Sequence, residues 1–266
     1  MTVALFDPAL GSSLLIAPSI YDLPELEGAH EAFWTAVQVE LEKLPSAQDA
    51  SDAPAPIGQI CSYQYAAHWA DKLRLLATPR YGAPGCHGPF VRHVVVVARS
   101  SPAQTLADLR DARCAVGATM TNAVSALRAA VAPLSGGQSF FSDLIAFPNE
   151  TSAALAVAEG EADLASLDCV AFALLLRARP QLVQALRVLS WSGRAPAAPF
   201  VAEANTTPDQ VVGLQAALHA VARDPSYKSL RAELLLDGVN GLPSAHYRAA
   251  LHLESLAAQR GYSRLI

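Results

Sequence analysis

Short apolar segments alternate along this chain with longer stretches in which apolar residues recur at helical spacing. The first segment, Ser13 to Pro18, has the length of a strand, and the stretch from Leu26 to Leu44 that follows has apolar residues on one helical face. Val91 to Ala98 is a β-branched run that favours another strand. This alternation is typical of a layered α/β protein.

The same criteria predict the remaining elements. Loops are expected where proline and glycine interrupt both the helical and the strand spacing of apolar residues, as in Tyr81 to Gly88. Further strands are expected at residues 57–61, 73–77, 114–117, 144–147, 162–167 and 186–191. Further helices are expected at residues 62–70, 121–131, 150–159, 168–178, 208–221, 226–236 and 244–258, with Leu235 to Gly238 as a helix stop. No internal repeat is present.

Composition excludes several classes of protein. The chain has 266 residues, 52% of them hydrophobic and 16% charged, which is too apolar for a disordered protein. Its net charge is −5 and no basic cluster occurs, so a nucleic-acid partner is not expected. No apolar run reaches the roughly 18 residues of a transmembrane segment. The first eight residues lack a basic leader pattern, so we expect a cytoplasmic protein as written, or a periplasmic one if a leader is missing.

Several catalytic and cofactor motifs are absent from the sequence. Leu134 to Gln138 reads Leu-Ser-Gly-Gly-Gln, the signature peptide of transporter ATPases, but no lysine follows a glycine as a nucleotide-binding loop requires. The histidines form no HExxH pattern and the four cysteines no CxxC pair. There is no GxSxG nucleophile motif. We therefore expect no metal and no cofactor.

Polar residues gather where predicted strands pass into helices. The segments Gly117 to Ser125, Phe147 to Ser152 and Ser166 to Asp168 fall at the same edge of the predicted sheet, where open α/β sheets bind ligands. Cys61 to Tyr63 is a matching junction in the first half of the chain. Unpaired N–H groups of a first helical turn can hold a small anion without lysine or arginine. The alternative for Thr121 is an ordinary N-cap.

At these segments the chain resembles the PhnD-like phosphate, phosphite and phosphonate substrate-binding proteins of ABC transporters. The resemblance covers residues from about Leu14 to Asn205. It rests on Ile16 to Glu25, Gln59 to Tyr63, Tyr81 with Gly85 to Phe90, Leu106 to Arg110, and Ala154 to Asp168, which match the order and residue types of the family's motifs.

The resemblance implies an α/β, two-lobed type II periplasmic-binding-protein-like fold, each lobe a mixed sheet flanked by helices. Lobe I would comprise residues 1–97 and 196–266, and lobe II residues 98–195, joined by two crossing strands near Val94 to Ser100 and Leu189 to Ala195. A phosphate-like, phosphonate-like or zwitterionic solute would bind in the cleft between the lobes. The expected protein is a monomer that delivers its ligand to an ABC-transporter permease.

By position, the resemblance also implies which residues line the cleft. The first wall would hold Tyr21, Ser62, Tyr63 and Tyr81, and the second Thr119, Thr121, Asn122, Ser125, Asn149, Glu150 and Asp168. Cys61 and Cys86 fall at family cysteine positions, which allows a disulfide between them, although they would be free thiols in a reducing cytosol.

Two segments depart from the family pattern. Met120 to Ala123 lacks the glycine and one hydroxyl of the family's Ser-x-Ser-Gly anion clamp, and Pro148 to Glu150 replaces Gly-Ser-His. A carboxylate at Glu150 would repel a dianion in a dry cleft. Together with Asp168 it could instead hold an amine, as in an aminoalkyl phosphonate. The alternative is that Glu150 only favours its helix N-terminus and points to solvent.

Two other functions remain open at this point. Enzymes of the same fold, dehydratases or pyrimidine-precursor synthases, use cleft carboxylates and hydroxyls in acid–base steps, for which Glu150, Asp168, Cys61 and His87 would be the candidates. The chain could also be the effector-sensing half of a regulator that binds DNA. This function is disfavoured because no helix-turn-helix, which would bind the DNA, precedes Ser13.

Overall fold

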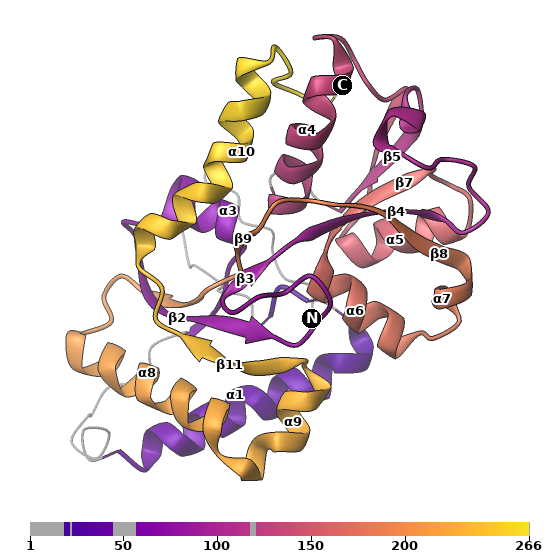
Figure 1. The fold of residues 1–266 in the computed structure, drawn as a ribbon. Coiled ribbons are helices and arrows are strands. Elements are labelled where there is room, and N and C mark those ends of the chain that lie inside the picture. Colours follow the sequence, from indigo (N-terminus) through magenta and orange to yellow (C-terminus); the bar gives the residue numbers. More distant parts are fainter. Residues whose placement is uncertain (1–18, 22, 45–56, 118–120, 266) are drawn as a thin grey trace.

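The structure is a computed structural model that describes residues 19–21, 23–44, 57–117 and 121–265. Its strands form two larger sheets, each covered by helices, and one two-stranded ribbon (Figure 1). The strand expected at residues 13–18 lies outside the described residues. In the described part of the chain, no helix combines the length and the apolar character that a bilayer span requires.

The first sheet has four strands in the order β1-β10-β2-β11, and every pair is antiparallel. Helices α1 and α8 pack against each other beside it, with Phe33, Val37 and Leu218 buried between the layers. The elements are β1 (Ile57–Gln59), β10 (Phe200–Glu203), β2 (Leu73–Tyr81), β11 (Leu236–Asn240), α1 (Glu27–Glu42) and α8 (Pro208–Arg223).

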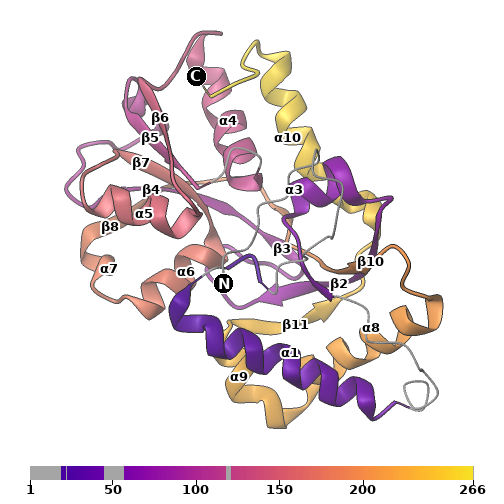
Figure 2. The same ribbon diagram turned by 180° about the vertical axis from the view of Figure 1, so that it is seen from behind.

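The second sheet has five strands in the order β6-β5-β7-β4-β8. Strand β5 is parallel to β6 and β7, and β4 is antiparallel to β7 and β8. Figure 2 shows helices α4, α5 and α6 around this sheet. The elements are β6 (Asp143–Ala146), β5 (Arg113–Val116), β7 (Leu164–Asp168), β4 (His93–Ala98), β8 (Leu186–Trp191), α4 (Asn122–Ser135), α5 (Glu150–Ala158) and α6 (Cys169–Ala178).

A two-stranded ribbon lies between the sheets, formed by β3 (Phe90–Val91) and β9 (Ala195–Pro196). Residues 93–97, which the sequence assigns to the first lobe, pair with β7 and β8 of the second sheet. Val94 to Val97 are all buried, so this strand needs a neighbour on both sides. The division into lobes remains a prediction, but the second sheet begins before residue 98.

The C-terminal helix α10 (Arg248–Gln259) runs alongside α4 in both views. Ala257, Tyr262 and Leu265 complete a core cluster with residues of the second sheet and α4, such as Val131. The end of the segment assigned to lobe I therefore packs mainly against α4 and the second sheet, and α10 also contacts α3 and η2.

Several expectations for individual elements need correction. The expected helix at residues 62–70 is a short α-helix, α3 (Ser62–Gln64), that continues into a π-helical turn, η2 (Tyr65–Trp69). Leu235 does end a helix, with a positive φ of 53°, but the residues after it form β11, a strand that the helical period had concealed. The remaining elements are η1 (Pro24–Leu26), η3 (Leu106–Leu109), α7 (Leu182–Ala185), η4 (Pro225–Tyr227), α9 (Lys228–Glu233) and η5 (Ser244–Tyr247).

Candidate functional site

At three strand-to-helix junctions of the second sheet, a side chain caps the start of the helix. Thr121 accepts a hydrogen bond from the backbone N–H of Val124 at 3.4 Å and starts α4. Asn149 accepts from the N–H of Ser152 at 2.8 Å and starts α5. The side chains of Thr121 and Asn149 thus satisfy first-turn N–H groups of their own helices. Thr119 lies outside the described residues.

Gly117 brings two of these junctions together. A Cβ atom built on Gly117 would overlap the backbone of Asn149 and Glu150, so only glycine lets the N-terminus of α5 pack directly on the end of β5. Strand β7 lies beside β5, so the same packing places the first residue of α5 next to the last residue of β7.

Glu150 and Asp168 form a carboxylate pair at this point. The Glu150 Oε2 atom accepts a hydrogen bond from the backbone N–H of Asp168 at 2.7 Å, and Asp168 Oδ1 accepts from the N–H of Val170 at 2.7 Å. Glu150 is partly buried and Asp168 is buried. The alternative that Glu150 points to solvent is therefore wrong.

Burial governs the charge of this pair. Burial and the neighbouring Asp168 charge raise the pKa of Glu150 to about 8, against the opposing hydrogen bond from the Asp168 N–H. Burial also raises the pKa of Asp168 to about 7, although N–H groups of Val170 and Ala171 favour its charged form. No lysine or arginine of the described residues pairs with either carboxylate. The pair is consequently only partly ionised near neutral pH.

His93 is a basic side chain close to this pair, but it does not supply a positive charge. Its Nε2 atom lies 4.0 Å from Asp168 Oδ2, across the register that pairs His93 of β4 with Asp168 of β7. Burial lowers the pKa of His93 to about 4, so the imidazole is neutral at pH 7. Sequence reasoning did not assign His93 to the site, because only the strand order brings it to Asp168.

Ser62 and Asn122 join the starts of α3 and α4. The Ser62 hydroxyl donates to the carbonyl of Pro196 at 2.9 Å and accepts from the Asn122 amide. A hydroxyl has one proton, so Ser62 must accept from the Nδ2 group of Asn122, which leaves Oδ1 facing away. That oxygen is buried and has no hydrogen-bond partner in the described structure. The structure thus brings one predicted residue of each wall into direct contact.

Comparison with known proteins agrees with this architecture. Residues 56–247 match the family model described as "ABC transporter, phosphonate, periplasmic substrate-binding protein". The chain belongs to this family. Its role is accordingly that of a solute-binding protein of the transport type.

Solved structures show the same type II periplasmic-binding fold. A binding protein component of an ABC phosphonate transporter from Pseudomonas aeruginosa is similar with a TM-score of 0.65 and 15% identity, over 86% of this chain and 74% of that one. PhnD1 from Prochlorococcus marinus in complex with methylphosphonate gives a TM-score of 0.62 and 11% identity, over 84% and 82%. A Xanthomonas citri protein bound to ATP gives 0.57 and 14%, over 84% and 83%. Comparison with curated protein sequences finds no significant match.

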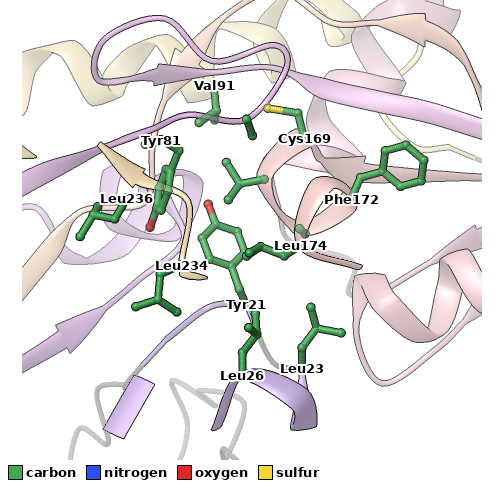
Figure 3. Packing of buried hydrophobic residues seen from close by; sticks show 14 of the residues in the cluster. Tyr21, Leu23, Leu26, Tyr81, Val91, Cys169, Phe172, Leu174, Leu234 and Leu236 are labelled. Atoms are coloured by element: carbon green, nitrogen blue, oxygen red, sulfur yellow. The ribbon is translucent and has the colours of Figure 1, made fainter. Parts of the chain in front are cut away.

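In this phosphonate-binding family member, the first wall of the site is aromatic. The rings of Tyr21 and Tyr81 meet edge to face with centroids 5.5 Å apart (Figure 3). Gln59 donates from Nε2 to the Tyr81 hydroxyl at 3.1 Å. Burial raises the pKa of both tyrosines, and the Asp168 charge raises it further, so the aromatic wall lies within electrostatic range of the carboxylate pair. Gln59, which sequence reasoning did not assign to the site, fixes the Tyr81 hydroxyl.

Tyr63 and Ser125 are two other predicted wall residues. The Tyr63 hydroxyl donates to Oε2 of Glu254 on α10 at 2.5 Å, so its polar end is engaged by the C-terminal helix. Ser125 is buried in the first turns of α4. His87, a candidate of the enzymatic alternative, lies exposed in the loop between β2 and β3.

The cysteines differ from the expected pairing. All four are free thiols, and Cys86 lies against Cys169, with 3.6 Å between the sulfur atoms, rather than against Cys61. The reason is that the loop before β3 folds over the start of α6. The Cys61 thiol instead lies beside backbone N–H groups of Tyr63, Gln64 and Asn122, although burial still raises its pKa.

Proposed function

We propose that the solute of this binding protein is a small zwitterion, with an ammonium group beside Glu150 and Asp168 and an oxyanion at the start of α4. The observation that carries the proposal is the carboxylate pair itself. The Glu150 carboxylate accepts a 2.7 Å hydrogen bond from the backbone N–H of Asp168, and neither acidic side chain pairs with a lysine or arginine among the described residues. Such groups are costly to bury as ions unless a positive charge joins them.

A ligand ammonium would supply that charge. It would lower the pKa of both carboxyl groups and form charge-assisted hydrogen bonds with them. The unpartnered Oδ1 of Asn122 is another buried acceptor, and it too requires a donor. Like the two carboxylates, this oxygen favours a ligand that donates a hydrogen bond.

The oxyanion end rests on the start of α4. Helix N-termini attract anions through unpaired N–H groups and the helix dipole, without any lysine or arginine. A simple alkyl phosphonate would lack the ammonium group and would meet Glu150 as a like charge. An aminoalkyl phosphonate carries both groups, and the Prochlorococcus relative bound to methylphosphonate supports a phosphonate as the anionic part.

Calorimetry with 2-aminoethylphosphonate and ethylphosphonate tests this assignment. We expect the wild-type protein to bind the amine at least about tenfold more tightly, and Glu150→Gln to lose most of that preference. Glu159→Gln, an exposed position at the other end of α5, is the matched control and should keep it. Equal affinities for the two ligands in the wild-type protein would contradict the ammonium site. Absence of binding to both would contradict the phosphonate assignment.

We further propose that the protein acts in the periplasm and hands its ligand to an ABC-transporter permease. The family to which the chain belongs supports both steps. Uptake of the ligand should then depend on this protein in cells that contain the cognate permease. Uptake that is unchanged after deletion of the protein would contradict the transport role.

An enzymatic role remains the second candidate, and one observation favours it. Two carboxyl groups whose pKa values lie near 7 and 8 suit acid–base chemistry at neutral pH. Conversion of a carboxylate metabolite that is lost in Glu150→Gln, with the fold intact, would support an enzyme. Recovery of the bound solute unchanged, identified by mass spectrometry, would support transport.

A further inference from the structure

Cys86 and Cys169 face each other across the boundary between the two sheets. Their sulfur atoms are 3.6 Å apart although the residues are 83 positions apart in sequence. Cys86 lies in the loop that follows β2 of the first sheet, and Cys169 is the first residue of α6, directly after β7 of the second. Figure 3 shows Cys169 in the same cluster as Tyr21 and Tyr81.

Backbone contacts hold both cysteines in place. The N–H of Cys86 donates to the carbonyl of Ala83 at 3.1 Å, and the N–H of Cys169 donates to the carbonyl of Arg92 at 3.0 Å. Between them, Gly85 has a φ of 96°, and any side chain there would overlap the ring of Trp191 and crowd the Cys169 sulfur. Glycine thus permits the close approach of the two thiols.

We propose that Cys86 and Cys169 form a reversible thiol–disulfide pair that links the two sheets beside the ligand site. A disulfide has a sulfur–sulfur distance of about 2.0 Å, so small side-chain rotations close the remaining gap. The bond would join the β2–β3 loop to the helix whose N-cap is Asp168. The redox state of the pair would therefore act on the wall that holds the carboxylate pair.

A low-molecular-weight disulfide, such as oxidised glutathione, is the oxidant that this reaction requires. Cys86 is only partly buried and reacts first: its thiolate attacks one sulfur of the reagent, forms a mixed disulfide and releases one glutathione thiolate. The thiolate of Cys169 then attacks the Cys86 sulfur and releases the second glutathione. Two protein thiols are oxidised to one disulfide, and one glutathione disulfide is reduced to two thiols.

The surroundings of Cys169 determine how the oxidation depends on pH. It is buried, and its contact with Cys86 together with burial raises its pKa. The second step should therefore be faster at pH 8 than at pH 7, since only the thiolate attacks. The closed loop spans 83 positions, so oxidation should raise the Tm of the full chain, by about 5–10 °C.

The experiment treats the purified full chain with oxidised glutathione at pH 8, alkylates the remaining thiols and maps the peptides by mass spectrometry without reduction. We expect two of the four thiols to disappear, a peptide that links Cys86 to Cys169, and a higher Tm that dithiothreitol reverses. Cys86→Ser should abolish the link and the Tm increase. Cys61→Ser is the matched control and should retain both.

Three results would overturn the proposal. The first is a protein that keeps all four thiols while alkylation shows that Cys86 is accessible. The second is a stable glutathione adduct on Cys86 that Cys169 does not resolve. The third is a link between Cys61 and Cys86. If the link forms but Tm and the calorimetric affinity for 2-aminoethylphosphonate both stay the same, the coupling to the ligand site is wrong. The thiol mapping does not depend on the proposed ligand, so it stands or fails separately.

Discussion

Glu150 Oε2 accepts a hydrogen bond from the backbone N–H of Asp168 at 2.7 Å, which unites two acidic residues from different strand-to-helix junctions. Neither carboxylate has a lysine or arginine partner among the described residues. The charge state of this pair therefore controls both the stability of the empty protein and the chemistry of the ligand it accepts.

The empty protein should lose stability as the pH rises from 6.5 to 8. Glu150 and Asp168 ionise near 4.5 and 3.8 when unfolded but near 8 and 7 when folded, so the folded state binds more protons in this range. The free energy of unfolding then falls with increasing pH, by about 2 kcal/mol over this range. Urea unfolding at several pH values measures it.

His93 sets the lower end of the pH range in which stability should fall. Its pKa falls from 6.5 to about 4 on folding, so between these values it increases stability with rising pH and opposes the carboxylates. Glu150→Gln should flatten the dependence between pH 6.5 and 8. A wild-type protein that becomes more stable over that range would contradict the raised pKa values.

Gly117→Ala should disrupt the site. The added methyl group overlaps the backbone at the start of α5, so Glu150 must move away from Asp168. We expect a loss of about 2 kcal/mol or more in the free energy of unfolding, together with weaker ligand binding. Gly193→Ala is the control, since nothing lies within 4 Å of its added Cβ, and it should change neither. Equal behaviour of the two variants would refute the close approach.

Ser62→Ala should destabilise the contact between the starts of α3 and α4. The substitution leaves the carbonyl of Pro196 and the amide of Asn122 without their shared partner in a buried location. We expect a cost of about 1–3 kcal/mol in urea unfolding. Ser255→Ala, at an exposed position of α10, should cost close to nothing. A neutral result for Ser62→Ala would mean that water satisfies both groups.

Glu254 connects α10 to both halves of the molecule. It accepts from the Tyr63 hydroxyl at 2.5 Å and pairs with Arg128 of α4 at 2.7 Å, and the Arg128 side chain is only 12% exposed. Glu254→Ala should therefore cost about 1–2 kcal/mol in the free energy of unfolding, because it leaves a largely buried guanidinium without its carboxylate.

The matched control for this prediction is Glu25→Ala. Glu25 pairs with Arg179 at the same distance of 2.7 Å, but the Arg179 side chain is 27% exposed, against 12% for Arg128. We expect its loss to cost about 0–1 kcal/mol. If Glu25→Ala costs as much as Glu254→Ala, the anchoring of α10 through Arg128 is refuted.

Local signals in the sequence predicted much of the second sheet and its helices. Residue types and spacing identified strand β4 by its β-branched run, and the starts of two helices by Thr121 and Asn149. These signals are local because each depends only on neighbours within one element. The sequence did not predict strand β11, because its first residue, Leu236, fits the helical spacing of the expected helix at residues 226–236. The resemblance to phosphonate-binding proteins supplied the family and the type II fold, which the comparisons confirm, whereas the division into lobes remains a prediction.

The sequence by itself determined the fold class, the strand-to-helix junctions and the polar residues gathered at them, because periodicity and capping depend on neighbours along the chain. Only the tertiary structure decided which of those residues meet. The parallel pairing of β5 and β7 joins Glu150 to Asp168, and the antiparallel pairing of β4 brings His93 to them. The fold of one loop over α6 selects Cys169 as the neighbour of Cys86. These contacts depend on strand order and packing between distant segments, which no local pattern specifies.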